Sequence, residues 1–227
     1  TTRLTVEFGA TLARAGWSVA IFDAAFATQG LATYLDAHVD RDVTALSTGE
    51  SGLDETLYEY PAELPGKLAF CPARAPFERL ARAKTAGAAE RFERQISAAS
   101  LSHDAVLVDT PPIGANQALA AVNTADRVAV VTTDTERGAD ALALAQDRLA
   151  DIDADIDTVV ANRAAGDGPL APDIEIPSSD TRRPADCPTC LEPETEFAPA
   201  VAAAVEALFE TSLGFDFAEE SRFGGIV

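Results

Sequence analysis

Asp109 follows a run of apolar residues at 105–108 and precedes a rigid Thr-Pro-Pro-Ile-Gly turn at 110–114. A strand buried on both faces is apolar throughout, so this run predicts a central strand that Asp109 ends. The carboxyl edge of such a sheet is where α/β folds bind ligands. A carboxylate at that edge is therefore placed to contact a bound ligand.

Asp23 ends a second apolar run, residues 17–22, and is therefore expected at the same edge as Asp109. Apolar residues at helical spacing over 4–15, closed by Gly16, predict that the chain begins with a helix. The first helix and the ends of two strands are thus the elements that must position the two carboxylates.

The rest of the sequence alternates strand-length and helix-length patterns. This order predicts a doubly wound α/β fold with a mostly parallel sheet covered by helices on both faces. We expect one domain over 1–213 and an acidic tail over 214–227, with an irregular segment at 166–199. The other expected strands are 67–70, 127–133 and 158–161, and the other expected helices are 77–99, 116–124, 134–149 and 197–213.

The chain of 227 residues has a formal charge of −20, and Lys67 and Lys84 are its only lysines. We interpret this charge as adaptation to a salt-rich cytoplasm, because a Debye length of about 3 Å in molar salt screens self-repulsion. Direct DNA binding would need a basic patch, which the sequence does not offer. With no apolar run of about 18 residues and no leader pattern, we expect a cytoplasmic protein.

Several motifs, in this order, resemble the deviant Walker A ATPases of the MinD and ParA family. Leu-Ala-Arg-Ala-Gly at 12–16 and Val-Ala-Ile-Phe-Asp at 19–23 are similar to the family's first helix and following strand. Val-Leu-Val-Asp-Thr-Pro-Pro at 106–112 resembles its Walker B motif. Val-Val-Ala-Asn-Arg at 159–163 resembles the strand that contacts adenine.

The resemblance implies the P-loop NTPase fold and ATP with Mg²⁺ as cofactors. By its pattern, Thr2 supplies a hydroxyl to the metal and Asp109 approaches the metal through water. Asp23 positions or polarises the attacking water. A plain strand-end role for Asp109 and a capping role for Asp23 are the alternatives.

The resemblance assigns nucleotide contacts to Thr1, Thr2, Gly114, Asn162 and Arg163. Thr1 and Thr2 stand where free N–H groups of a helix favour phosphate, although they could simply cap the helix. Gly114 would let the backbone approach the γ-phosphate. Asn162 with Arg163 would contact the base, or form an ordinary turn.

Three departures from the family pattern concern the start of the chain. The glycine-rich phosphate loop is not in the sequence, and Ala25 replaces the second aspartate of Asp-x-Asp. Counted back from Gly16 without gaps, Thr1 stands at the position of the loop lysine, whereas one inserted residue would restore Gly-Lys before Thr1. We therefore expect the sequence to be a fragment, with a strand and the phosphate loop preceding Thr1.

Two cysteines form the motif Cys187-Pro188-Thr189-Cys190, and Cys71 is the third. A reduced, metal-free loop is our interpretation, and a zinc site shared by two copies is the alternative. The acidic tail would be repelled by anionic lipid, so we expect no membrane docking through it.

The leading hypothesis is a MinD/ParA-like switch that binds ATP, forms a homodimer, and positions cargo through an unidentified protein partner. The first alternative, suggested by Thr1 and Ala25, is a catalytically silent scaffold like the pilus-assembly proteins TadZ and CpaE. The second is a bacterial tyrosine kinase, disfavoured because Tyr34, Tyr58 and Tyr60 are the only tyrosines and none lies in the tail.

Overall fold

The computed structural model describes residues 1–191 and 196–217. Its helices are α1 (Thr2–Arg14), η1 (Leu31–Tyr34), α2 (Val43–Thr48), α3 (Phe77–Ala83), α4 (Ala86–Ala99), α5 (Asn116–Thr124), α6 (Glu136–Ala150), η2 (Pro184–Asp186) and α7 (Phe197–Phe209), of which η1 and η2 are 3₁₀ helices. Its strands are β1 (Ser18–Asp23), β2 (Tyr58–Glu59), β3 (Lys67–Cys71), β4 (Ala105–Asp109), β5 (Ala129–Thr133), β6 (Thr158–Asn162) and β7 (Ile174–Ile176).

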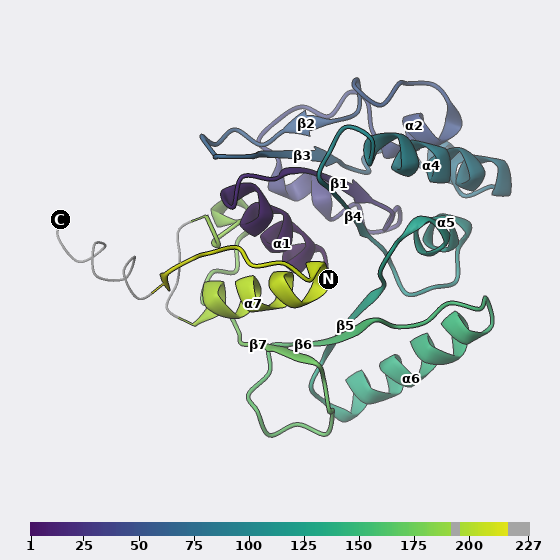
Figure 1. The fold of residues 1–227 in the computed structure, drawn as a ribbon. Helices are drawn as coiled ribbons and strands as arrows, with labels where there is room; N and C mark the ends of the chain where they lie inside the picture. The colour runs from purple at the N-terminus through teal and green to yellow at the C-terminus, as the bar shows by residue number, and fades with distance from the viewer. Residues whose placement is uncertain (192–195, 218–227) are drawn as a thin grey trace.

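The strands form two sheets, ordered β2-β3-β1-β4 and β5-β6-β7. All the pairings are parallel except that of β2 with β3. Helices α1 and α7 lie on one side of the strands, and α2, α4, α5 and α6 lie on the other (Figure 1). The predicted α/β class with a mostly parallel sheet is therefore confirmed.

Strand β1 lies between β3 and β4 and separates two apolar clusters. Val19 and Ile21 pack in the cluster that includes α1 and α7, whereas Ala20 and Phe22 pack in the cluster that includes α2 and α4. Successive side chains of a strand point to opposite faces, so one apolar run supplies both clusters. This burial fixes β1 and places Asp23 at its end.

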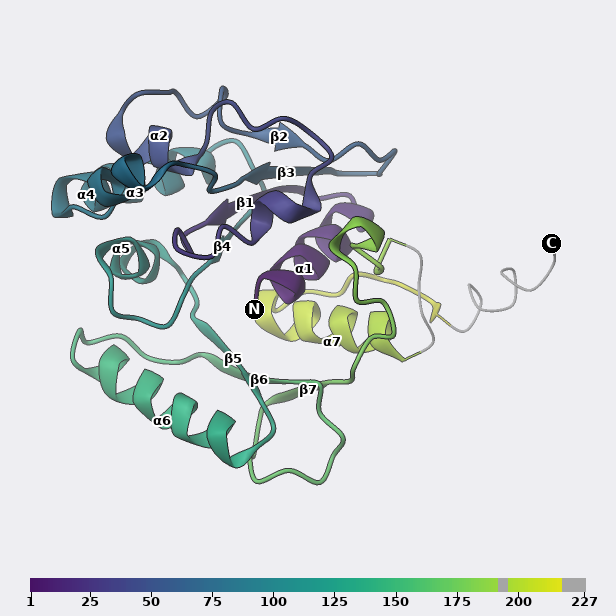
Figure 2. The ribbon, with the colours of Figure 1, turned by 180° about the vertical axis from the view of Figure 1, so that it is seen from behind.

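Strand β4 is at one end of the first sheet and β5 is at one end of the second, so each has one edge facing the boundary between the two sheets. We call this boundary the seam. Within residues 1–191 and 196–217, no strand pairs with either edge. The apolar side chains of β4 at 106–108 and of β5 at 130–131 are only half-buried, whereas β1 is buried from Val19 onward. The molecule seen from behind shows the same separation of β4 from β5 (Figure 2). Both edges thus retain backbone groups that could pair with another strand.

The predicted helix over 77–99 is wrong in one respect, because it is two helices broken before Ala86. Thr85 has an extended backbone with ψ of 156°, and its hydroxyl donates to the carbonyl of Arg82 at 2.9 Å. A threonine side chain that bonds nearby backbone competes with helix continuation. The helical spacing of the apolar residues did not reveal this break.

The segment expected to be irregular, 166–199, contains β7, η2 and the start of α7. The short elements α2, β2 and η1 were not predicted either. The start of the predicted tail, 214–217, lies against α1, where the Arg14 guanidinium is 4.4 Å from the ring centroid of Phe215. The rest of that tail, 218–227, lies outside the described residues. None of the described helices has the length and apolarity needed to cross a membrane.

Candidate functional site

Asp23 and Asp109 end neighbouring parallel strands and are directly opposite each other in the register of β1 and β4. The amide of Ala24 donates to the carbonyl of Asp109 at 2.9 Å, which holds the two strand ends together. Asp23 is fully buried and Asp109 is 2% exposed. Two carboxylates are thus held side by side, away from solvent, at the carboxyl edge of the sheet.

Thr2 joins this pair from the first turn of α1. Its Oγ1 donates to Asp109 Oδ2 at 2.5 Å, across 107 positions of sequence. The other oxygen, Asp109 Oδ1, is buried and has no hydrogen-bond partner among the residues that the structure describes. A buried carboxylate oxygen without a partner carries an energetic cost that a bound cation would relieve. The hydroxyl of Thr2 and this orphaned oxygen of Asp109 fit Mg²⁺, which takes oxygen ligands.

The carboxylate of Asp23 accepts hydrogen bonds from three backbone amides. Ala25 donates to Oδ1 at 2.9 Å, while Leu31 and Ala73 donate to Oδ2 at 3.3 Å and 3.4 Å. Burial, followed by the negative charge of Asp109, raises the pKa of Asp23 to about 6, and these amides partly oppose the rise. Asp23 therefore holds the backbone around the site in place. Its pKa of about 6 lies near neutral pH, so its charge changes with pH in that range.

The loop between β1 and η1 closes over the first turn of α1. A Cβ built on Gly30 would lie 3.1 Å from Thr2 Oγ1, so glycine allows this close approach. The next residue, Leu31, is the one that donates to Asp23. Thr2, Asp23 and Asp109 are thus brought together by one loop and two strand ends.

Thr1 is the N-cap residue of α1, but its side chain makes no capping hydrogen bond. Its carbonyl accepts from the amide of Thr5 at 3.2 Å. The hydroxyl of Thr1 is therefore not engaged in holding the helix, which leaves the interpretation of Thr1 as a simple side-chain cap without support.

Gly114 lies in the loop between β4 and α5, five residues beyond Asp109. Arg148 of α6 donates to the carbonyl of Ile113 in this loop. A Cβ on Gly114 would lie 3.6 Å from that guanidinium, in ordinary contact distance. The contact with Arg148 was not predicted, because it joins residues 35 positions apart with no local sequence signal.

Asn162 and Arg163 are at the carboxyl end of β6, in the second sheet. Asn162 is opposite Ile176 in the parallel register of β6 and β7. Arg163 has a φ of 60°, a conformation typical of a sharp turn after a strand. These two residues are thus on the other side of the seam from Thr2, Asp23 and Asp109.

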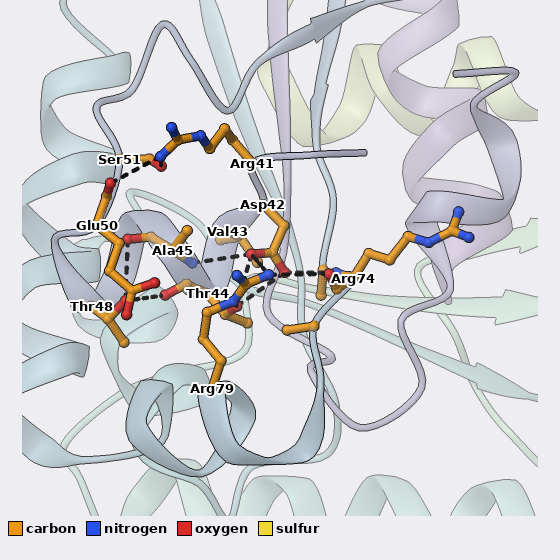
Figure 3. A network of polar contacts seen from close by, with 12 residues as sticks. Arg41, Asp42, Val43, Thr44, Ala45, Thr48, Glu50, Ser51, Arg74 and Arg79 are labelled. Carbon is orange, nitrogen blue, oxygen red and sulfur yellow. Dashed lines mark hydrogen bonds and ion pairs between the residues drawn. The ribbon is translucent and has the colours of Figure 1, made fainter. Parts of the chain in front are cut away.

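A further buried carboxylate, Asp42, lies beside the loop that follows β3 (Figure 3). Its Oδ1 forms an ion pair with the Arg79 guanidinium at 3.1 Å and accepts from the amide of Ala45 at 3.1 Å. Its Oδ2 accepts from the amide of Arg74 at 2.7 Å. The hydroxyl of Thr44 also donates to this carboxylate, at 2.8 Å. Asp42 is therefore paired with a cation and bonded through both oxygens.

Sequence reasoning also missed Arg3 and Glu7, one helical turn apart on α1. Arg3 Nε donates to Glu7 Oε1 at 2.5 Å, and Glu7 is fully buried. Both side chains also bond the chain that follows β7, at Thr181 and Thr189 among others. The only local signal was an Arg–Glu pair at i,i+4, which is usually a solvent-exposed helix pair.

Cys187 and Cys190 are buried, at 4% and 2% exposure. The Cys187 thiol donates to the carbonyl of Arg183 at 3.2 Å. Burial, followed by the charge of Glu7, raises the pKa of the Cys190 thiol well above its usual range. Over the part of the chain that the structure describes, no group of three or more His, Cys, Asp or Glu side chains could hold a metal ion.

Comparison with known proteins identifies solved structures of similar fold. No protein-family model and no curated protein matches the chain. Among solved structures, the septum site-determining protein MinD of Pyrococcus horikoshii, complexed with Mg-ADP, matches with a TM-score of 0.73 at 18% identity, over 92% of this chain and 89% of that one.

Two further solved structures show the same likeness. The MinC:MinD cell division complex of Aquifex aeolicus matches with a TM-score of 0.74 at 20% identity, covering 95% of this chain and 93% of the other. A ParA family ATPase from Chlorobium tepidum matches with a TM-score of 0.66 at 16% identity, covering 89% and 92%. The chain therefore has the MinD-like P-loop NTPase fold.

Proposed function

We propose that this protein is an ATP-dependent switch of the MinD/ParA type, which binds ATP with Mg²⁺, dimerises and positions a cellular cargo. The observation that carries the proposal is the convergence of Thr2, Asp23 and Asp109, with one buried oxygen of Asp109 lacking a partner. The fold supports it, since one structural neighbour is a MinD with Mg-ADP and another is a complex of MinD with MinC.

Thr2 and Asp109 are the residues that would hold Mg²⁺. When bound, the ion neutralises charge on the phosphates of the nucleotide. The first turn of α1 offers N–H groups to the same phosphates, favoured by the helix dipole. Because the pKa of Asp23 is raised only to about 6, its carboxylate is largely ionised at neutral pH and can accept a hydrogen bond from an attacking water.

We place the nucleotide-binding domain at 1–213 of this sequence. The unpaired edges of β4 and β5 support a further strand in this domain. A parallel strand between them would join the two sheets and bury the half-exposed residues 106–108 and 130–131. We place this strand, and a phosphate loop after it, immediately before Thr1. The encoded sequence upstream of Thr1 tests this directly, with a glycine-rich loop as the expected result.

The remaining contacts of the nucleotide come from both sides of the seam. Gly114 would let backbone approach the terminal phosphate, and Thr1 would stand beside the phosphate loop. Asn162 and Arg163, at the end of β6, would contact the base. A nucleotide spanning these positions would touch both half-sheets at once.

The test is ATP turnover and mass in solution, measured in molar salt on the complete gene product. We expect slow hydrolysis and an ATP-dependent dimer, with Asp23→Ala retaining the dimer and losing turnover by about 10³-fold. Asp140→Asn, an exposed position on α6, is the matched control and should behave as wild type.

Two outcomes would change this proposal. ATP binding and dimerisation without measurable turnover in the wild type would favour the silent scaffold, consistent with Ala25 in place of the second aspartate. Absence of ATP binding by the complete product would contradict the proposed switch altogether.

A further inference from the structure

The segment that follows β7, residues 177–190, is fastened to α1 by one charged pair. Arg3 donates to the carbonyl of Thr181 at 2.8 Å, to Thr189 Oγ1 at 2.9 Å and to Ser179 Oγ at 3.3 Å. Its Nε donates to Glu7 Oε1. Guanidinium geometry suits such multiple acceptors, because its N–H groups form a rigid planar fork.

Glu7 completes the attachment from the next turn of the helix. Its Oε1 accepts from the amide of Thr189 at 3.0 Å and from the hydroxyl of Thr189 at 3.1 Å. Its Oε2 accepts from the amide of Cys190 at 2.9 Å. If the segment opened, the carboxylate of Glu7 would lose these three donors and keep only Arg3, so opening of the segment is costly.

The two ends of this attachment both adjoin the nucleotide site. Arg3 directly follows Thr2, whose hydroxyl bonds Asp109. The 177–190 segment directly follows Ile176, which is paired with Asn162, and the amide of Ala164 donates to the carbonyl of Ile176 at 3.0 Å. A ligand that contacts the start of α1 and the end of β6 therefore connects α1 to the region of β6 and β7. Arg3 and Glu7 connect α1 to the segment that directly follows this region.

We propose that Arg3 and Glu7 are positioning residues that fasten the 177–190 segment to the nucleotide-binding end of α1, so that bound nucleotide and the closed segment stabilise each other. This inference rests on the proposed function for its ligand. Coupling of this kind is reciprocal: the factor by which nucleotide favours closure equals the factor by which closure favours nucleotide.

The three cysteines report on the two parts of the molecule separately. Cys187 and Cys190 lie in the fastened segment, whereas Cys71 is fully buried in the cluster on the other face of β1. Alkylation of Cys187 and Cys190 therefore measures opening of the segment, and alkylation of Cys71 measures global unfolding. Peptide mass spectrometry after timed iodoacetamide labelling resolves the three rates.

The experiment compares wild type, Glu7→Gln and Arg3→Lys in molar salt, with and without saturating Mg²⁺ and ATP. We expect nucleotide to slow labelling of Cys187 and Cys190 in the wild type by about tenfold, with no change at Cys71. Both variants should label these two cysteines about tenfold faster without nucleotide, and bind ATP more weakly. Glu90→Gln and Arg94→Lys, at exposed positions of α4, are the matched controls.

The outcomes separate this inference from the proposed function. Equal unliganded labelling of wild type and Glu7→Gln would overturn the fastening role, whatever the nucleotide result. If wild type binds ATP but Glu7→Gln binds it equally well and shows the same protection, the coupling is overturned while the proposed function stands. If wild type binds no ATP, the proposed function and the coupling both fail. Faster labelling of Cys71 in a variant indicates unfolding, and Arg3→Lys, which keeps the charge, then decides the fastening role.

Discussion

Two buried acidic sites lie in the same half of this molecule and differ in how their charge is compensated. Asp42 has the Arg79 guanidinium at 3.1 Å and donors on both oxygens. Within residues 1–191 and 196–217, the pair of Asp23 and Asp109 has no cation bonded to it, and Asp109 Oδ1 has no hydrogen-bond partner. The first site is complete with its own side chains, whereas the second is complete only with a cation.

The difference indicates that the Asp42 site stabilises the fold, whereas the pair of Asp23 and Asp109 serves ligand binding. A satisfied buried ion pair such as that of Asp42 holds neighbouring segments in place, and breaking it leaves an uncompensated charge. A buried pair of carboxylates without a cation costs stability in the unliganded protein, which is the pattern expected at a binding site. The variants below test whether the two sites behave in opposite ways.

The largest effect is expected at the complete site. Asp42→Ala should lower the free energy of unfolding by about 4 kcal/mol, because Arg79 loses its partner and the amides of Ala45 and Arg74 lose their acceptor. Chemical denaturation in molar salt measures the change, with the exposed Asp140→Ala as the control. A loss no greater than that of the control would show that the network does not stabilise the fold.

The next effect concerns pH and the raised pKa of Asp23. The native protein holds a proton on Asp23 up to about pH 6, whereas the unfolded chain releases it near 3.8. Stability contributed by this group is therefore present below pH 3.8 and is lost as pH rises to 6, by about 3 kcal/mol. Asp23→Asn cannot titrate, so its stability relative to wild type should increase over that interval.

Denaturation of both proteins across pH 4 to 7 checks this expectation. Subtracting wild type from variant at each pH removes the contribution of the other carboxylates, which both proteins share. A stability difference that stays constant with pH, or that falls as pH rises, would contradict the raised pKa of Asp23.

A smaller effect of the same sign is expected for Asp109→Asn. Removing the charge of Asp109 relieves its repulsion of Asp23, which is the second cause of the raised pKa of Asp23. Unliganded Asp109→Asn should therefore be more stable than wild type by about 1 kcal/mol at pH 7. Thermal and chemical unfolding without nucleotide measure this gain, and a clear loss of stability would place Asp109 with Asp42 as a structural group.

The carboxyl ends of the strands were the part of the site that the sequence made predictable. Apolar runs that end at Asp23 and Asp109 place both carboxylates at one edge, and parallel pairing then brings them into register. The same reasoning predicted the α/β class, because strand and helix patterns alternate along the chain. Both results depend on local patterns of neighbouring residues, which a single sequence is enough to show.

Other features depend on partners that are distant in sequence. Glu7 pairs with Arg3 locally but bonds the amide of Cys190, 183 positions away, so its burial could not be foreseen. The break at Thr85 reflects one hydroxyl bonding its own backbone, which helical periodicity does not register. Strand β7 has only three residues and too few side chains to show an alternation.

The central claim is that Thr2 and Asp109 hold Mg²⁺ against a triphosphate, and calorimetric titration of the complete gene product tests it most directly. ATP affinity is measured in molar salt with and without Mg²⁺, for wild type, Asp109→Ala and the control Asp140→Ala. The account predicts that Mg²⁺ strengthens ATP binding by about tenfold or more in wild type and control, and has little effect in Asp109→Ala. The same strengthening by Mg²⁺ in Asp109→Ala as in wild type would contradict it.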